Sequence, residues 1–308
     1  MAKPIWLADI GIDAPLALRL VSAQFPELGA RNAEPFGSGW DNAAFLIDEK
    51  VVFRFPRRRS AAGFIEREVA ILPRVAPHLP LAISAPRFAG SASPAFPWKF
   101  AGYDLIEGVT ACSITLSDEA RSGLAEPLAH FLRALHDVDP QPLASVGLPP
   151  DELGRLDHDK RLGLTMERIP TLTQSGLGAR LDAFVTWLET HPPVALKASQ
   201  HRLVHGDLYA RHVLLDVRLC PIGVIDWGDV HRGDPALDIA IAHLMLPSSA
   251  YPAFRAAYGP LDERTWTAAR YRAIYHAIVE VDYGIRSNDA AMCSMGLAAL
   301  RLMETALD

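Results

Sequence analysis

Residues 203–216 read LVHGDLYARHVLLD, and residues 221–229 read PIGVIDWGD. The apolar runs 213–215 and 222–225 predict the two strands of a short hairpin. That hairpin would return Asp226 to the loop that carries Asp207. Asp207, His212 and Asp226 are therefore expected to meet on loops beside buried strands.

This set of side chains suits phosphoryl transfer. One carboxylate orients and deprotonates the acceptor hydroxyl, and further ligands hold the metal ion that bridges the nucleotide phosphates. Such a reaction asks the protein for little covalent chemistry, so positioning and charge neutralisation supply most of the catalysis. A His-Gly-Asp triplet alone carries little weight, and the interpretation depends on the rest of the chain.

The first third of the chain is predicted to be strand-rich with one long helix. Apolar runs at 43–47 and 51–55 flank a polar turn, which is typical of two antiparallel strands. The glycines within residues 36–42 indicate a tight loop whose backbone a ligand can approach. Further expected elements are a helix over 60–76 and extended segments around 87–89 and 100–106.

The remainder is predicted to be mostly helical. Ser117 is the expected N-cap of a helix whose apolar positions continue to Leu135. A second amphipathic helix is expected from Leu177 to Leu188, where two prolines soon follow. Helix is expected again from about residue 234.

The change near residue 107 marks a predicted boundary between two lobes. A chain of 308 residues exceeds one typical core. We predict an α+β, bilobal fold with a small β-rich N-lobe over residues 1–106. A larger, mostly α-helical C-lobe would span residues 107–308, with a ligand cleft between the lobes.

The chain resembles the aminoglycoside phosphotransferases, which share the protein-kinase-like fold. In that family, His-Gly-Asp is followed by four residues and then Asn or His, and an Ile-Asp-Phe/Trp motif comes about twenty residues later. His205-Gly206-Asp207, His212 and Ile225-Asp226-Trp227 match in order and spacing. The resemblance implies that Asp207 is the catalytic base and that His212 and Asp226 hold a metal ion. The 2''-type aminoglycoside and macrolide phosphotransferases also carry His at this position.

The same resemblance implies a nucleotide site for ATP or GTP and covers nearly the whole chain. Arg54 stands where the family's third strand carries a cation towards the phosphates, and Glu68 stands where a helix supplies its partner. The implied nucleotide-binding residues are Gly37, Ser38, Gly39, Arg54, Glu68, Glu107 and Val109.

Two residues depart from the commoner pattern. Arg54 replaces the Lys of protein kinases and forks differently. His212 replaces Asn, and Mg²⁺ prefers oxygen ligands. Mg²⁺ is the expected ion, with Mn²⁺ as the alternative that an imidazole favours.

The acceptor is predicted to be an alcohol of antibiotic-like size, and the overall resemblance to antibiotic kinases favours an aminoglycoside. If it is an aminoglycoside, Asp229, Glu280 and Asp282 are the carboxylates expected to bind its amines. The apolar run at 239–246 lacks the acidic cluster of a 2''-type enzyme and favours a less cationic acceptor, such as a macrolide or a metabolite. A catalytically silent nucleotide-binding module is the remaining alternative, although it would be expected to have lost Asp207 and Asp226.

Composition narrows the partners. The net charge of −6 and pI near 6.0 give no electrostatic reason to expect nucleic acid or an anionic membrane. No stretch reaches the ~18 apolar residues of a membrane span. Three scattered cysteines indicate neither a disulfide framework nor a cysteine metal site, so a reducing cytoplasm is expected. Nothing in the sequence indicates the oligomeric state.

Overall fold

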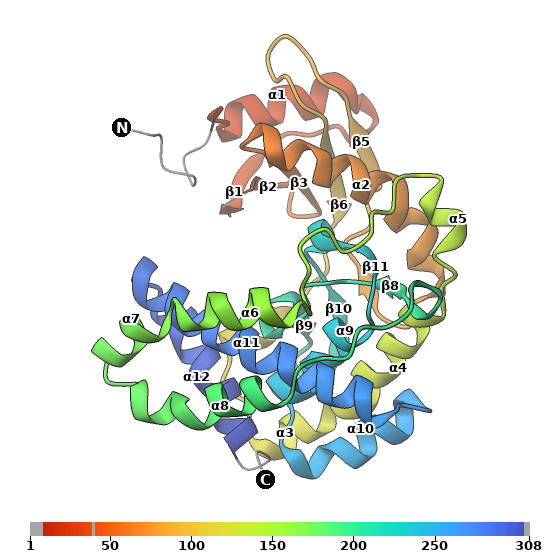
Figure 1. The fold of residues 1–308 in the computed structure, drawn as a ribbon. Coiled ribbons are helices and arrows are strands. Elements are labelled where there is room, and N and C mark those ends of the chain that lie inside the picture. Colours follow the sequence, from red (N-terminus) through yellow and green to blue (C-terminus); the bar gives the residue numbers. More distant parts are fainter. Residues whose placement is uncertain (1–8, 39–40, 305–308) are drawn as a thin grey trace.

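The chain folds into two lobes, a smaller one built on a five-stranded sheet and a larger, mostly helical one (Figure 1). We call them the N-lobe and the C-lobe. The computed structural model describes residues 9–38 and 41–304. The predicted α+β, bilobal architecture is confirmed.

The N-lobe sheet is antiparallel throughout, with the strand order β1-β2-β3-β6-β5. Its strands are β1 (Ala33–Ser38), β2 (Asn42–Ile47), β3 (Val51–Pro56), β5 (Phe88–Gly90) and β6 (Phe100–Asp104). The predicted hairpin is β2 and β3, where Ile47 lies opposite Val51. Strand β1 escapes sequence-based prediction because Pro35 and Gly37 weaken a strand pattern, and the register shifts between these two residues.

Side-chain alternation in β3 gives the N-lobe sheet two different faces. Phe53 and Phe55 are fully buried on one face with Phe96 and Phe100, and the rings of Phe55 and Phe100 stack at 4.7 Å. Arg54 lies on the opposite face, which helix α2 (Arg59–Val75) covers. Helix α2 confirms the predicted helix and continues through Pro73 for two residues. Helix α1 (Ala14–Gln24) completes the N-lobe.

The C-lobe helices surround α11, which packs against α9 and α12. These helices are α3 (Asp118–Gly123), α4 (Ala125–Asp137), α5 (Gln141–Ala144), α6 (His158–Met166), α7 (Ile169–Gln174), α8 (Gly178–Thr190), α9 (Ala236–Met245), α10 (Tyr251–Tyr258), α11 (Glu263–Ser287) and α12 (Ala290–Glu304). The predicted N-cap is confirmed, since the Ser117 hydroxyl accepts from the amide of Ala120. The helix that follows is interrupted at Leu124, so the single predicted helix is two, α3 and α4.

Two small sheets present the loops of the quoted motif. One has the order β4-β10-β9-β7, with β4 (Ala82–Ile83), β7 (Val109–Thr110), β9 (Val213–Leu215) and β10 (Pro221–Val224). The predicted hairpin is therefore β9 and β10. The other pairs β8 (Arg202–Val204) with β11 (His231–Gly233), and it places Val204 opposite His231.

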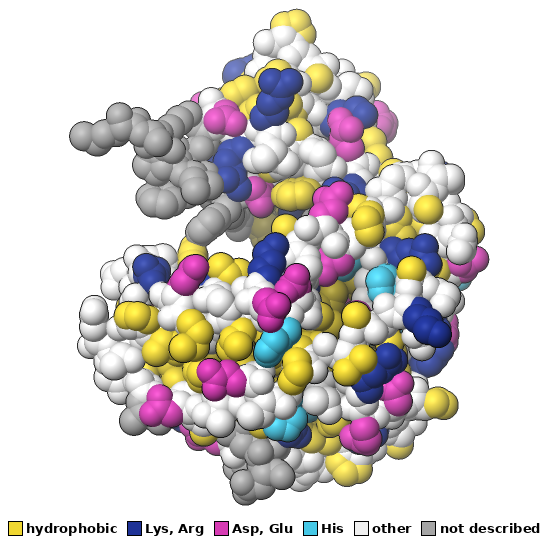
Figure 2. Space-filling view, viewed as in Figure 1, with side chains coloured by type: hydrophobic (Ala, Val, Ile, Leu, Met, Phe, Trp, Pro, Cys, Tyr) yellow, Lys and Arg dark blue, Asp and Glu magenta, His cyan; other side chains and the backbone are white. Residues whose placement is uncertain are grey.

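Residues 105–108 connect β6 of the N-lobe sheet to β7 of the C-lobe. In the space-filling view the surface narrows between the lobes (Figure 2). Among the helices of the described residues, none is both long and apolar enough to cross a bilayer.

The aromatic core predicts how one N-lobe substitution will behave. Replacing Phe55 by Ala should lower the free energy of unfolding by about 3–5 kcal/mol, because the cavity loses both transfer energy and ring contacts. Equilibrium urea unfolding measures this change. Phe36, which is 53% exposed, is the matched control, and Phe36→Ala should cost less than about 0.5 kcal/mol. Equal effects at the two positions would contradict the described core.

Candidate active site

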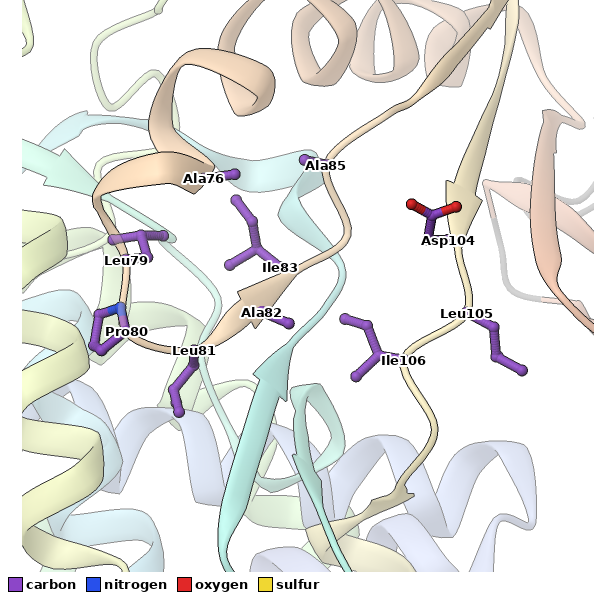
Figure 3. A pocket seen from close by; sticks show the side chains of 10 residues that line it. All are labelled: Ala76, Leu79, Pro80, Leu81, Ala82, Ile83, Ala85, Asp104, Leu105 and Ile106. Atoms are coloured by element: carbon purple, nitrogen blue, oxygen red, sulfur yellow. The ribbon is translucent and has the colours of Figure 1, made fainter.

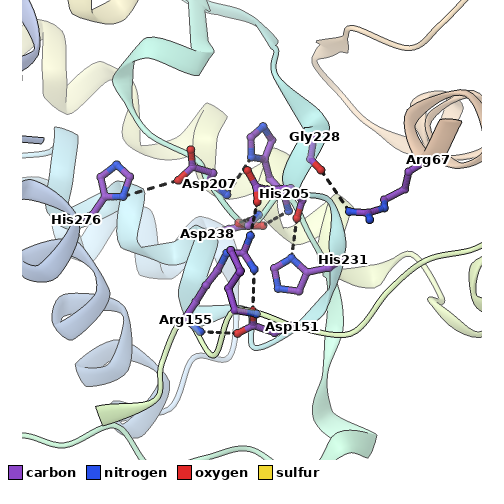
Figure 4. Close-up of polar contacts among 12 residues, drawn as sticks. Arg67, Asp151, Arg155, His205, Asp207, Gly228, His231, Asp238 and His276 are labelled. Carbon is purple, nitrogen blue, oxygen red and sulfur yellow. Dashed lines mark hydrogen bonds and ion pairs between the residues drawn. The ribbon is translucent and has the colours of Figure 1, made fainter. Parts of the chain in front are cut away.

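A buried carboxylate on α9 holds the loop of Asp207 by accepting hydrogen bonds from its backbone. Asp238 is fully buried and accepts hydrogen bonds from the amides of His205 and Gly206, both at 2.8 Å. Its Oδ2 also lies 3.2 Å from Nε2 of His136. Burial alone would raise the pKa of Asp238, but His136 and these donors hold the pKa below its ordinary value. Asp238 therefore anchors the loop (Figure 4).

Only glycine fits at the turn before Asp207. Gly206 has φ +85°, and a Cβ added there would lie 2.7 Å from the carbonyl oxygen of Asp229 and from the ring of His231. A side chain would need both a left-handed backbone and a displaced neighbour. The close approach lets the strands β8 and β11 deliver the loops of Asp207 and Asp229 to one point.

His205 ties the two motif loops together. Its Nε2 donates to the carbonyl of Ile225 at 3.0 Å, and its Nδ1 accepts from the amide of Asp207 at 3.3 Å. Burial lowers the pKa of His205, which suits the neutral ring that this pattern requires. His205 is therefore a structural residue that fixes one motif loop against the other.

His212 and Asp226 face each other across the site. His212 ends the 3₁₀ turn Ala210–His212, and its Nδ1 donates to the backbone carbonyl of Asp207 at 2.8 Å. Its Nε2 is thereby directed to Oδ2 of Asp226, 3.4 Å away. Asp226 has φ +64°, a left-handed conformation that is rare outside glycine and is concentrated at functional sites.

This pair fits a divalent cation. A metal-binding histidine usually donates its other ring nitrogen to a carbonyl, and His212 does so. Within the described residues, no group of three or more His, Cys, Asp or Glu side chains is arranged around one point for a metal ion. Two protein ligands agree with Mg²⁺ in phosphoryl-transfer sites, where waters and substrate phosphates complete the coordination shell.

Arg54 connects the N-lobe to this pair. Its Nη1 lies 3.2 Å from Oε1 of Glu68, and its Nη2 lies 3.0 Å from Oδ1 of Asp226. Tyr103 donates to the other oxygen of Glu68 at 2.5 Å. Desolvation opposes these charges, but Glu68 and Asp226 together hold the pKa of Arg54 above its ordinary value, so the guanidinium stays charged. The same guanidinium, helped by His212, keeps the pKa of Asp226 well below its usual range despite desolvation.

The predicted Arg54–Glu68 pair is thus formed, and Tyr103 is an addition to it. Tyr103 lies in β6, within the extended segment expected around residues 100–106. Its buried side chain points to Glu68, because strand alternation in β6 turns it towards α2.

The other predicted nucleotide residues occupy more open positions. Gly37 and Ser38 end strand β1, opposite Ala44 and Ala43, so the strand continues into the segment predicted as a loop. Gly39 lies outside the described residues. Glu107 is exposed in the segment between the lobes, and Val109 begins β7.

Two residues of α11 approach Asp207 that the sequence interpretation missed. Nη2 of Arg272 lies 3.4 Å from Oδ1 of Asp207, and Nδ1 of His276 lies 3.8 Å from the same oxygen. Arg272, His276 and Glu280 repeat at intervals of four, which places them on one face of the helix. That spacing was the available signal, but nothing local in α11 points to a loop so distant in the sequence.

The three predicted acceptor carboxylates have other partners. Asp229 pairs with Arg155, which also binds Asp151 at 2.7 Å. Asp282 lies 2.7 Å from Arg286 and 3.5 Å from Arg168.

Glu280 is buried on the same helix face as His276. Its Oε1 lies 3.1 Å from Nε2 of His276, but the two groups are not aligned for a hydrogen bond. Burial, followed by the charge of Asp207, raises the pKa of Glu280 well above its ordinary value. Of the three carboxylates, Glu280 is the one that the structure brings near Asp207.

A separate cavity of about 580 Å³ lies where the segment between the lobes meets the end of α2. Its lining is mostly apolar and includes Leu79, Ile83 and Ile106 (Figure 3). None of the candidate site residues lines it, so this cavity is not the active site.

Comparison with known proteins agrees with this geometry. A family model described as the phosphotransferase enzyme family (APH) matches residues 32–273. The chain belongs to the phosphotransferase enzyme family. It is therefore an enzyme that transfers a phosphoryl group to an alcohol group, and the predicted family resemblance is confirmed.

Solved structures of phosphotransferases share the fold. The GDP and kanamycin complex of APH(2'')-IIIa is 24% identical, with a TM-score of 0.68 over 94% of this chain and 98% of that chain. The GDP complex of wild-type aminoglycoside 2'-phosphotransferase-IIIa is 22% identical, with a TM-score of 0.70 over 96% and 99%. Macrolide 2'-phosphotransferase MphH from Brachybacterium faecium is 22% identical, with a TM-score of 0.58 over 94% and 97%. The predicted protein-kinase-like fold is thereby confirmed.

The anchor of the Asp207 loop predicts a pH-dependent stability. Replacing Asp238 by Asn should lower the free energy of unfolding by about 3 kcal/mol at neutral pH, because two buried amides lose a charged acceptor. The folded pKa of Asp238 lies below its unfolded value, so its contribution is complete above about pH 4 and is lost as the pH falls through the folded pKa. The gap between the wild type and the variant should therefore narrow in acid.

Urea unfolding at several pH values measures this gap. Asp104→Asn is the control, since Asp104 is exposed and pairs with an equally exposed Arg87; its loss should cost less than about 1 kcal/mol at any of these pH values. A gap for Asp238→Asn that stays constant into acid would contradict the charged anchor.

Proposed function

We propose that the chain is a small-molecule kinase that moves the γ-phosphoryl group of ATP or GTP onto a hydroxyl of its acceptor. One observation carries this proposal. A series of contacts of 2.8 to 3.4 Å joins the side chains of Arg54, Asp226 and His212 to the backbone carbonyl of Asp207, where the two lobes meet.

Asp207 is the proposed catalytic base. Its carboxylate is 30% exposed, and its backbone is fixed by contacts to His205 and His212. The contacts from Arg272 and His276 fall on Oδ1, so among the described residues Oδ2 keeps no partner. Oδ2 is the oxygen available to orient the acceptor hydroxyl and accept its proton.

Arg54 is proposed to direct the nucleotide phosphates, since it stays charged and is held from both sides. His212 and Asp226 are proposed to hold Mg²⁺, or Mn²⁺. The bound ion would neutralise phosphate charge during transfer. The proposed contacts of the nucleotide also include Gly37, Ser38, Gly39, Glu107 and Val109, and the proposed lobe boundary stays at residues 106 and 107.

The donor is proposed to be ATP or GTP. The relatives described above include GDP complexes, and a further neighbour, APH(2'')-IIa, forms a ternary complex with streptomycin and ATP.

The aminoglycoside acceptor predicted from sequence needs carboxylates that are free to pair with amines. Asp229 and Asp282 already pair with arginines, and Glu280 is buried with a raised pKa. These observations favour the second acceptor class, a less cationic alcohol, over a polycation. Kanamycin and streptomycin are found in complexes of the relatives, so aminoglycosides are included among the test compounds below.

The proposed base predicts a sharp loss of turnover. Acceptor-dependent release of nucleoside diphosphate should fall by about 10²–10⁴-fold in Asp207→Asn, because the amide cannot take the hydroxyl proton. Nucleotide affinity, measured by calorimetry with Mg²⁺, should be unchanged. Asp137→Asn, an exposed change on α4, is the control and should retain full activity.

The compounds tested as acceptors are aminoglycosides, macrolides, amino alcohols, sugars and hydroxy acids, each assayed with ATP and with GTP. Nucleotide binding without release for any acceptor would favour the catalytically silent module. Release that Asp207→Asn retains would remove Asp207 from the proposed role.

A further inference from the structure

Arg272 is a buried cation at the acceptor side of Asp207. It lies in the middle of α11, its side chain is 9% exposed, and Nη2 reaches Oδ1 of Asp207 at 3.4 Å. The partner carboxylate of Asp207 is more open to solvent, with 30% of its side chain exposed. Arg272 is therefore hydrogen-bonded to the carboxylate that is proposed to meet the acceptor hydroxyl.

The guanidinium of Arg272 makes few hydrogen bonds with the protein. It has five N–H donors, yet within the described chain its hydrogen bonding consists of the single long contact with Asp207. Its Cζ also lies 5.9 Å from the centre of the Tyr275 ring. A buried charge with so few hydrogen bonds is costly unless a further partner arrives.

The neighbouring arginines differ in this respect. Arg155 lies between the carboxylates of Asp151 and Asp229. Arg161 donates to the carbonyls of Gly154 and Leu153 and to the hydroxyl of Tyr275. Arg272 is thus the member of this cluster that has donors to spare.

The helix around Arg272 supplies no compensating negative charge. Burial lowers the pKa of His276 to about 4, so this ring is neutral near pH 7. Glu280 has a raised pKa because it is buried beside Asp207. Burial also lowers the pKa of Arg272, and the charges of Arg155 and Arg161 add to that effect against Asp207. The acceptor side of Asp207 therefore favours a negative group over a positive one.

We propose that Arg272 binds an oxyanion of the acceptor, a carboxylate or a phosphate, next to the hydroxyl that is phosphorylated. This inference rests on the proposed kinase function and names its substrate class. A guanidinium matches the two oxygens of an oxyanion with parallel N–H donors. Because Arg272 and Asp207 are in contact, the oxyanion and the reacting hydroxyl must be separated by only a few bonds.

The reaction keeps this group unchanged. The acceptor hydroxyl gives its proton to Asp207 as its oxygen forms a bond to the γ-phosphorus. The bond between the γ-phosphorus and the bridging oxygen of the nucleotide breaks, and the nucleoside diphosphate leaves with that oxygen. The oxyanion on Arg272 only holds the acceptor in place, so Arg272 is a specificity-determining residue.

Matched acceptor pairs test the proposal. Nucleoside diphosphate release is measured with glycerate and glycerol, gluconate and sorbitol, and glucuronate and glucose, which differ in the carboxylate. Glycerol 3-phosphate and glucose 6-phosphate form the phosphate arm. The oxyanionic member should have the higher kcat/KM, and the arm that responds tells carboxylate from phosphate.

The variant Arg272→Met should raise the KM of oxyanionic acceptors by about tenfold to a hundredfold, the loss expected for a charged hydrogen bond. The KM of the nucleotide should not change. Arg272→Lys keeps the charge without the fork and should recover part of the loss. Arg264→Met is the matched control, since Arg264 is a more exposed arginine of the same helix; it should change neither KM. Melting temperatures verify that each variant is folded.

Several results would overturn the inference. Neutral and oxyanionic members could react equally, or Arg272→Met could affect both alike. If only aminoglycosides or macrolides are phosphorylated, the kinase function is supported and the oxyanion site is contradicted. If no acceptor reacts at all, the proposed function fails. Calorimetry then tests the oxyanion site separately, by measuring whether the same acids bind to the protein in the presence of Mg²⁺ and nucleoside diphosphate. Binding that Arg272→Met abolishes supports an oxyanion site, whereas no binding removes it.

Discussion

The site depends on one buried carboxylate, Asp238, which accepts hydrogen bonds from two consecutive backbone amides. Those amides belong to a turn with φ +85° that has no space for a Cβ. Without the carboxylate, the two N–H groups would be buried and unpaired, which is costly. This contact fixes the position and direction of the loop. The positions of His205, Asp207 and His212 depend on it.

From that loop, an unbroken series of contacts between charged side chains extends from the C-lobe to the N-lobe. Glu68 holds Arg54, Arg54 holds Asp226, and Asp226 faces His212. The series links the N-lobe sheet to the C-lobe hairpin, so Arg54 and Asp226 are positioned by both lobes. Helix α11 brings a second guanidinium, that of Arg272, to Asp207. In the proposed mechanism, Asp207 is the base, Arg54 directs the phosphates and Arg272 binds the acceptor.

Much of this arrangement follows from local patterns. The alternation of β3 puts Arg54 on the face opposite the phenylalanine core, and the hairpin of β9 and β10 returns Asp226 to the loop. Where prediction failed, a long-range or irregular feature was responsible. Strand β1 contains a bulge beside proline, and the helix after Ser117 is interrupted at Leu124. Pro35 and Gly37 hide the strand, whereas the apolar spacing continues past Leu124 and hides the interruption of the helix.

The sequence by itself determined the family, the two-lobed fold and the motif residues Asp207, His212 and Asp226, because their order and spacing are local properties of the chain. The contacts that α11 makes with Asp207 were decided by tertiary structure alone. Arg272 and Asp207 are 65 residues apart, and only the packing of α11 brings them together. Packing likewise turned Asp229 and Asp282 towards arginines and buried Glu280. Whether a carboxylate is free to bind a ligand depends on its neighbours in space, which the order of residues does not specify.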